Sequence, residues 1–144
     1  MADLLMTRPV DAAQRFIAML PDALLSELQV IHSPLMAVKP LGQPISLGNN
    51  EAVIFTSSNG VSVAAETFTK PGVTAFCLGQ RTTMKAREAG WKAEYCGNTA
   101  DELVADMLQL RPTTELLHLR GLHARGNVME RIGTAWMNLA LIKI

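Results

Sequence analysis

The sequence predicts an α/β fold in which a parallel β-sheet is flanked by helices. From residue 51 onward, short apolar runs alternate with stretches of helical length, which is typical of βαβ units. The turns between these runs are short. Hydrophobic residues make up 49% of the 144 residues, enough for a real core, and the length suits one domain or one domain plus a fragment of another.

The first segment, residues 1–34, predicts two strands around a helix. Leu4–Met6 is typical of a short buried strand, and Pro9 suits the first position of the helix that follows. Apolar residues then recur at helical spacing, and Val30–His32 is a second strand. Pro and Gly are frequent in residues 35–50, which predicts a connector with an extended ribbon inside it.

The clearest unit of the chain starts at residue 52. Ala52–Phe55 is an apolar run typical of a strand buried on both faces. Small polar residues follow from Thr56 to Gly60, and a helix is predicted from about Asn59 to Phe68. This loop places hydroxyls and backbone N–H groups at the positive end of a helix dipole, which favours an anion.

The remaining elements continue the alternation. Gly90 is predicted to cap the second helix, and Thr99 or Asn98 to cap the third. Strands are predicted at residues 73–78, 91–96, 115–119 and 139–144, with helices ending near residue 89, ending before Pro112 and spanning about 128–135.

Polar loops at residues 56–60, 79–83 and 120–126 each follow a predicted strand. If the strands are parallel, all three loops open on the same edge of the sheet. They supply hydroxyls, helix N-termini and guanidinium groups, and no obvious acid–base pair. We therefore expect this edge to bind a ligand with several carboxylates.

Plainer interpretations of the same residues stay open. The polar residues at 57–59 can cap a helix without binding anything. Arg81 and Arg125 can be solvated charges, and Gly79 can serve close backbone approach. The histidines are scattered and have no second ligand at helical spacing, which gives a metal or catalytic role little weight: His32, His118 and His123.

The composition argues against several classes of protein. Acidic and basic residues number 13 each, which argues against a nucleic-acid-binding surface. The apolar runs are too short to span a bilayer and the start lacks a secretory signal, which predicts a cytoplasmic protein without a membrane partner. Cys77 and Cys96 are predicted to be buried, reduced thiols. The sequence shows no Cys/His metal pattern, P-loop, dinucleotide fingerprint or nucleophile elbow.

In their order and spacing, these motifs resemble those of the uroporphyrinogen-III synthase family. The matching pieces span nearly the whole chain: Leu4–Pro9 with its Thr-Arg-Pro, Pro34, Ile-Phe-Thr-Ser-Ser-Asn-Gly-Val at residues 54–61, Leu-Gly-Gln-Arg-Thr at residues 78–82 with Gly90, and Leu117–Gly121. Each piece is weak alone, and their shared order is fairly specific.

The resemblance implies a flavodoxin-like, HemD-like fold of two α/β domains joined by a ribbon. By analogy, residues 1–34 begin the first domain, residues 35–50 connect, residues 51–138 form the inserted second domain, and residues 139–144 return toward the first. The rest of the first domain would then be missing, so a C-terminal truncation is expected.

The resemblance also implies an activity, that of a lyase in haem biosynthesis. The enzyme closes the linear tetrapyrrole hydroxymethylbilane with inversion of ring D and loss of water, needs no metal or organic cofactor, and is expected to be a monomer if complete. The resemblance assigns no catalytic residue, and it implies these substrate-binding residues: Arg8, Ser57, Ser58, Asn59, Thr82, Arg120 and Gly121.

One departure from the family pattern concerns tyrosine. The family usually carries a Tyr just after the return strand, as the favoured acid for water loss, whereas Leu141–Ile144 has none and Tyr95 is the only Tyr here. We therefore expect little or no activity from this chain alone. Two alternatives are a non-catalytic flavodoxin-like module that binds a small anion, and a fragment that needs a partner to cover an exposed sheet edge.

Overall fold

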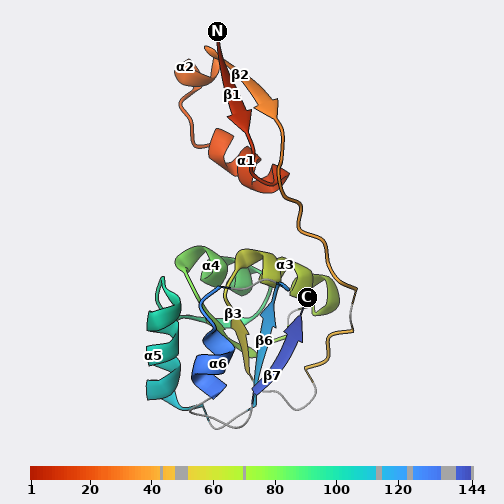
Figure 1. The fold of residues 1–144 in the computed structure, drawn as a ribbon, viewed down its shortest axis with the longest axis vertical. Coiled ribbons are helices and arrows are strands. Elements are labelled where there is room, and N and C mark those ends of the chain that lie inside the picture. Colours follow the sequence, from red (N-terminus) through yellow and green to blue (C-terminus); the bar gives the residue numbers. More distant parts are fainter. Residues whose placement is uncertain are drawn as a thin grey trace. The chain divides into compact units, whose positions relative to one another are not determined.

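The computed structural model describes residues 1–42, 44–47, 52–69, 71–112, 115–122, 125–133 and 139–143. The chain divides into two compact units, Met1–Lys39 and Pro40–Ile144. The division falls inside the connector predicted at residues 35–50. Figure 1 shows the strands and helices of each unit.

The smaller unit is a two-stranded parallel sheet with two short helices. Its elements are β1 (Ala2–Met6), α1 (Val10–Ile17), α2 (Asp22–Leu25) and β2 (Leu28–His32). Pro9 lies at the N-cap of α1, close to the predicted position. Among its described hydrophobic residues only Met6 and Ala13 are buried. Because two strands cannot cover much apolar surface, this unit has little core of its own.

The larger unit is a five-stranded sheet with helices on both faces. Its elements are β3 (Ala52–Phe55), α3 (Ser58–Thr67), β4 (Thr74–Cys77), α4 (Gln80–Glu88), β5 (Lys92–Tyr95), α5 (Ala100–Leu110), β6 (Leu116–Arg120), α6 (Val128–Gly133) and β7 (Leu139–Lys143). The strand order is β5-β4-β3-β6-β7, and every neighbouring pair is parallel. The predicted parallel α/β fold is therefore confirmed, with β3 at the centre.

The central strand β3 is buried along its whole length because both faces of the sheet are covered. Val53 and Phe55 face the core under α3 and α4, whereas Ala52 and Ile54 face the core under α5 and α6. This alternation follows from the period of two along a strand. It explains why the sequence shows an unbroken apolar run at this point and no alternating pattern.

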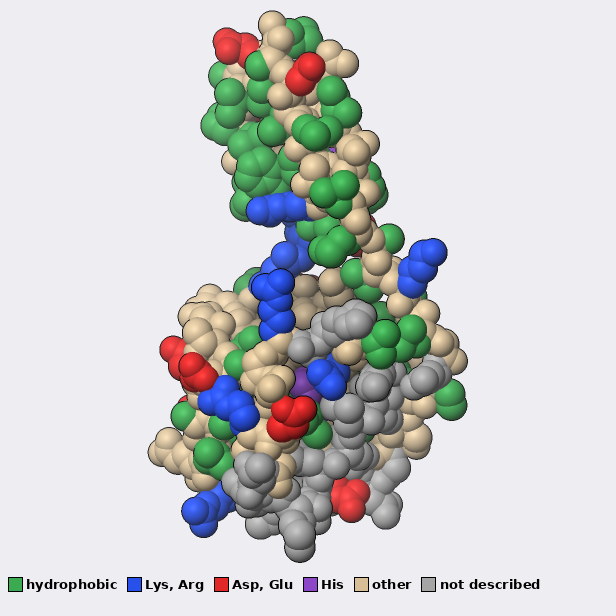
Figure 2. Space-filling model, in the orientation of Figure 1, with side chains coloured by type: hydrophobic (Ala, Val, Ile, Leu, Met, Phe, Trp, Pro, Cys, Tyr) green, Lys and Arg blue, Asp and Glu red, His purple; other side chains and the backbone are tan. Residues whose placement is uncertain are grey.

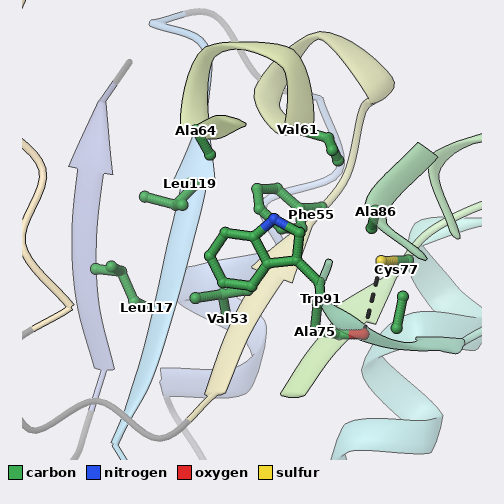
Figure 3. Packing of buried hydrophobic residues seen from close by; sticks show 11 residues of the cluster. Val53, Phe55, Val61, Ala64, Ala75, Cys77, Ala86, Trp91, Leu117 and Leu119 are labelled. Carbon is green, nitrogen blue, oxygen red and sulfur yellow. Dashed lines mark hydrogen bonds between the residues drawn. The ribbon is translucent and has the colours of Figure 1, made fainter. Parts of the chain in front are cut away.

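Trp91 anchors the core under α3 and α4. Its ring meets Phe55 edge-on at a centroid distance of 5.2 Å and Phe68 at 5.9 Å. Figure 3 shows the indole lying between β3 and α3, with Val61 and Ala64 above it. Edge-to-face pairs of this kind add to the stabilisation from buried area alone. The packing holds the start of α3 over the carboxyl end of β3.

The connector and the last strand differ from the expectation in detail. Residues 33–42 and 44–47 form no strand, so the predicted ribbon is absent from these positions. Ile45 and Leu47 instead pack against the core under α3 and α4 that contains Trp91, called the Trp91 core below. β7 pairs with β6 and completes the larger sheet, with Lys143 opposite Arg120. The assignment of residues 139–144 as a return strand toward the first domain stays a prediction.

Candidate functional site

The carboxyl ends of the parallel strands form one edge of the larger sheet, and most of the predicted site residues lie there. Ser57, Ser58 and Asn59 follow β3, Thr82 lies in the first turn of α4, and Arg120 ends β6 just before Gly121. These six positions, far apart in the sequence, share this edge because every strand runs in the same direction. Arg8 belongs to the smaller unit.

At the turn from β3 to α3, Ser57 is the helix N-cap. Its Oγ accepts a hydrogen bond from the backbone N–H of Gly60 at 3.2 Å. The plainer interpretation, that this residue caps a helix, is therefore correct for Ser57. Ser58 and Asn59 form the first turn of α3, where Asn59 is exposed. The exposed amide of Asn59 is thus more accessible than the half-buried Ser58.

At the turn from β4 to α4, the helix start has no side-chain cap. Gly79 is the N-cap residue, with φ at 80°, and a Cβ added there would meet no atom within 4 Å. The backbone of Gly79 is held by its N–H, which donates to the carbonyl of Gly97 at 2.8 Å. Thr82 occupies the third helical position and is only 6% exposed. The turn therefore presents open backbone at the positive end of a helix.

The turn from β5 to α5 has the opposite character. Thr99 and Glu102 form a capping box, in which the carboxylate of Glu102 accepts from the backbone N–H groups of Asn98 at 2.6 Å and Thr99 at 3.0 Å. These two hydrogen bonds lower the pKa of Glu102. A carboxylate of the protein itself thus already occupies this helix start.

Strand β6 also brings His118 close to this edge. This histidine is not among the residues predicted to bind the substrate. His118 is 2% exposed, and its Nε2 lies 3.3 Å from Oγ1 of Thr56. Its Nδ1 is buried and has no hydrogen-bond partner among the described residues, and the same holds for Nε of Arg120. Burial, and then the charge of Arg120, lowers the pKa of His118 to about 4. The available signal was its place two residues before Arg120, on the same face of a buried strand.

The other residues considered from the sequence are more ordinary. Arg81 and Arg125 are exposed, which fits solvated charges. Arg8 is exposed, and its guanidinium carbon lies 5.5 Å from the centroid of the Phe16 ring. His32 is exposed at the end of β2, and His123 lies outside the described residues.

The two cysteines are free and buried, as predicted. Burial raises the pKa of Cys77 to about 12 and that of Cys96 to about 11, so neither thiol forms a reactive thiolate at neutral pH. Within the described part of the chain, no group of three or more His, Cys, Asp or Glu side chains is placed to hold a metal ion.

Charges of both signs lie on the larger unit. Figure 2 shows acidic and basic side chains on the one face that it draws. An ion pair links α6 to α5, with Nη1 of Arg131 at 2.8 Å from Oδ1 of Asp101. No helix in the described ranges is long and apolar enough to cross a membrane.

The comparisons with known proteins point to one family. No curated protein matches the chain. A family model described as uroporphyrinogen-III synthase HemD matches residues 25–140, which is most of the sequence and includes strands β3 to β6 of the larger sheet and the first two residues of β7. This match, together with the parallel α/β order, shows that the chain belongs to the uroporphyrinogen-III synthase family.

Proposed function

We propose that this protein is a uroporphyrinogen-III synthase, a lyase that closes hydroxymethylbilane with inversion of ring D and loss of water. The observation that carries the proposal is the shared carboxyl edge, with open backbone at α4 and the guanidinium of Arg120 on β6, in a chain of this family. The substrate is a flexible polyanion, and this edge offers donors for carboxylates.

We infer a role for each group at the edge from its position and burial. The uncapped start of α4 binds a carboxylate through backbone N–H groups, and Thr82, being mostly buried, contributes chiefly its own N–H. Arg120 supplies a charge-assisted partner at the end of β6. Asn59 donates its exposed amide from α3. Ser57 and Ser58 shape that turn, and Gly121 keeps the backbone after β6 open, with no atom within 4 Å of a Cβ added there.

The proposed chemistry depends on positioning. Binding the carboxylates of a floppy chain fixes its two ends for ring closure and removes much of the entropic barrier. Preorganised dipoles and the guanidinium also favour charge that develops along the path. Arg8 lies in the smaller unit and stays a predicted substrate-binding residue. The proposed reaction uses no metal or organic cofactor, and no residue is assigned as the general acid.

Binding is the first test of this proposal. Isothermal titration of the purified chain with uroporphyrin III, the oxidised form of the proposed product, should show binding that Arg120→Gln weakens by about tenfold. Arg111→Gln is the matched control. Arg111 is exposed at the C-terminal end of α5, away from the carboxyl edge of the sheet, so its substitution should leave binding unchanged. No binding of uroporphyrin III by the wild-type chain would contradict the proposal.

A parallel titration with inorganic phosphate separates the small-anion alternative. Binding of phosphate without binding of uroporphyrin III would favour a non-catalytic anion-binding module. A coupled assay, in which a deaminase supplies hydroxymethylbilane, then tests the reaction by separating the type III isomer from the type I isomer that forms spontaneously. Formation of type III above the enzyme-free control would support cyclisation by this chain.

A further inference from the structure

His118 is a polar residue in an otherwise apolar layer of the larger unit. Leu117 and Leu119 on β6 face the Trp91 core, and Leu116 faces the core under α5 and α6. Since side chains alternate along a strand, His118 lies on the same face as Leu116, beside Ile54, with which it pairs in register. A buried polar ring in such a layer costs stability unless its hydrogen bonds are made.

The position of the ring proton follows from the neighbours of the two ring nitrogens. The lowered pKa keeps the ring neutral near pH 7, so it carries a single proton. A proton on Nε2 is donated to Thr56 Oγ1 and leaves only a lone pair of Nδ1 without a described partner. A proton on Nδ1 would bury an N–H without an acceptor among the described residues, the rarer and costlier arrangement. The favoured tautomer therefore has its proton on Nε2.

This tautomer fixes what the hydroxyl of Thr56 can do. When Oγ1 accepts from His118, the hydroxyl proton is free to be donated away from the ring. Thr56 follows β3 directly and is half-buried at the carboxyl edge. The register that pairs Phe55 with Leu119 places Thr56 beside Arg120 on the adjacent chain segment. An O–H donor next to a guanidinium whose buried Nε has no partner among the described residues matches the needs of a carboxylate.

We propose that His118 is a positioning residue, which holds the hydroxyl of Thr56 as a hydrogen-bond donor beside Arg120 for one carboxylate of the tetrapyrrole. The inference rests on the proposed function and goes beyond it, because it gives a buried strand residue a part in ligand recognition. His118 acts through Thr56 and does not touch the ligand.

Matched variants of the full chain test this by titration with uroporphyrin III. His118→Phe keeps a flat ring without nitrogens, and Thr56→Val keeps the shape of Thr56 without the hydroxyl. Each should weaken binding by about tenfold, the loss expected for one hydrogen bond to a charged group. The double variant should bind no more weakly than either single variant, because both remove the same interaction. His118→Gln, which keeps an N–H toward Thr56, should restore most of the affinity.

The tautomer gives a readout that does not depend on any ligand or variant. Long-range proton–nitrogen correlation spectra of the wild-type chain should show His118 with a proton on Nε2 and a lone pair on Nδ1 near pH 7. A proton on Nδ1 would overturn the inference, even if His118→Phe fails to fold.

The outcomes separate this inference from the proposed function. Wild-type affinity in His118→Phe, together with weakened binding in Arg120→Gln, would overturn the role of His118 and leave the synthase proposal standing. Additive losses in the double variant would show that the two residues act separately, which also overturns it. No binding by the wild-type chain would remove both proposals.

Discussion

The starts of α4 and α5 lie on the same edge of the same sheet, and they differ in whether side chains of the protein cap them. At α5, Thr99 is the cap and Glu102, at the third helical position, fills the helix start with the protein's own carboxylate. At α4, Gly79 stands at the cap and Thr82 at the third position, so neither half of a capping box is present. The α5 start is filled by the protein itself, and the unfilled α4 start fits the proposal that this turn binds an anion of the ligand.

Two glycines give the strongest test of this difference. Gly79 and Gly97 both have φ near 80°, so alanine strains the backbone at both positions. A Cβ at Gly79 meets open space, whereas one at Gly97 collides with the side chain of Glu102. Urea unfolding should show a loss of about 1–2 kcal/mol for Gly79→Ala and about 3 kcal/mol or more for Gly97→Ala, where overpacking adds to strain. Equal losses would contradict the view that one turn is open and the other closed.

As the pH falls, the free energy of unfolding should decrease through protonation of His118 at a higher pH than through protonation of Glu102. The folded protein holds the imidazole neutral, with a pKa of about 4 against the usual histidine value of 6.5, so the unfolded chain binds the proton more readily. Stability is therefore complete above pH 6.5 and falls as the pH drops toward 4. Between pH 7 and pH 5 the free energy of unfolding should decrease by about 2 kcal/mol.

The control for this pH effect is His118→Gln, which cannot titrate. Its free energy of unfolding should change little between pH 7 and pH 5 in the same urea experiment. The lowered pKa of Glu102 contributes stability that is present above its unfolded pKa and lost only at still lower pH. A wild-type decrease that persists in His118→Gln would show that another group is responsible.

Removing the cap of α5 should cost stability and leave ligand binding unchanged. Thr99→Ala deletes the oxygen that accepts from the backbone N–H of Glu102, with an expected loss of about 1 kcal/mol in the free energy of unfolding. Since this turn is filled by Glu102, titration with uroporphyrin III should give the wild-type affinity. Weaker binding in Thr99→Ala would place the α5 start in the ligand site and break the contrast with α4.

The smallest expected effect comes from a charge at the open helix start. Gln80 is exposed at the first position of α4, and Gln80→Glu should stabilise the helix slightly while repelling a bound carboxylate. Uroporphyrin III affinity should fall by about threefold, and less so at high salt. Gln109→Glu makes the same change on an exposed position near the far end of α5 and should leave the affinity as it is. Equal effects of the two changes would point to net charge and not to the α4 start.

Much of this edge could be predicted from the sequence because its signals are local. The apolar run of β3, the capping residue Thr99 and the glycine at residue 90 are each decided by neighbours within a few residues. The parallel order then followed from the alternation of elements, and it placed the loops on one edge. The role of Gly79 was predicted only as close backbone approach, and its open surroundings required the fold.

His118 could not be recognised in this way. Its burial and its contact with Thr56 depend on the pairing of β6 with β3, which no local pattern specifies. The packing of Ile45 and Leu47 on the Trp91 core is likewise a tertiary contact of a segment whose composition predicts only a connector. A sequence pattern shows the spacing of apolar residues along one helix or strand. It does not show which distant segment packs against that face.

The central place of β3 has a consequence for how the protein is made. Thr56 and His118 are 62 residues apart, so the neighbour that closes one side of β3 leaves the ribosome long after β3 itself. Until then the nascent chain carries an unpaired edge on its most apolar strand, the kind of edge on which newly made chains aggregate. The hydrogen bond between His118 and Thr56 is thus among the late contacts of folding. Under the proposed role of His118, molecules trapped before it forms should retain the α3–α4 half of the unit and should not bind the tetrapyrrole.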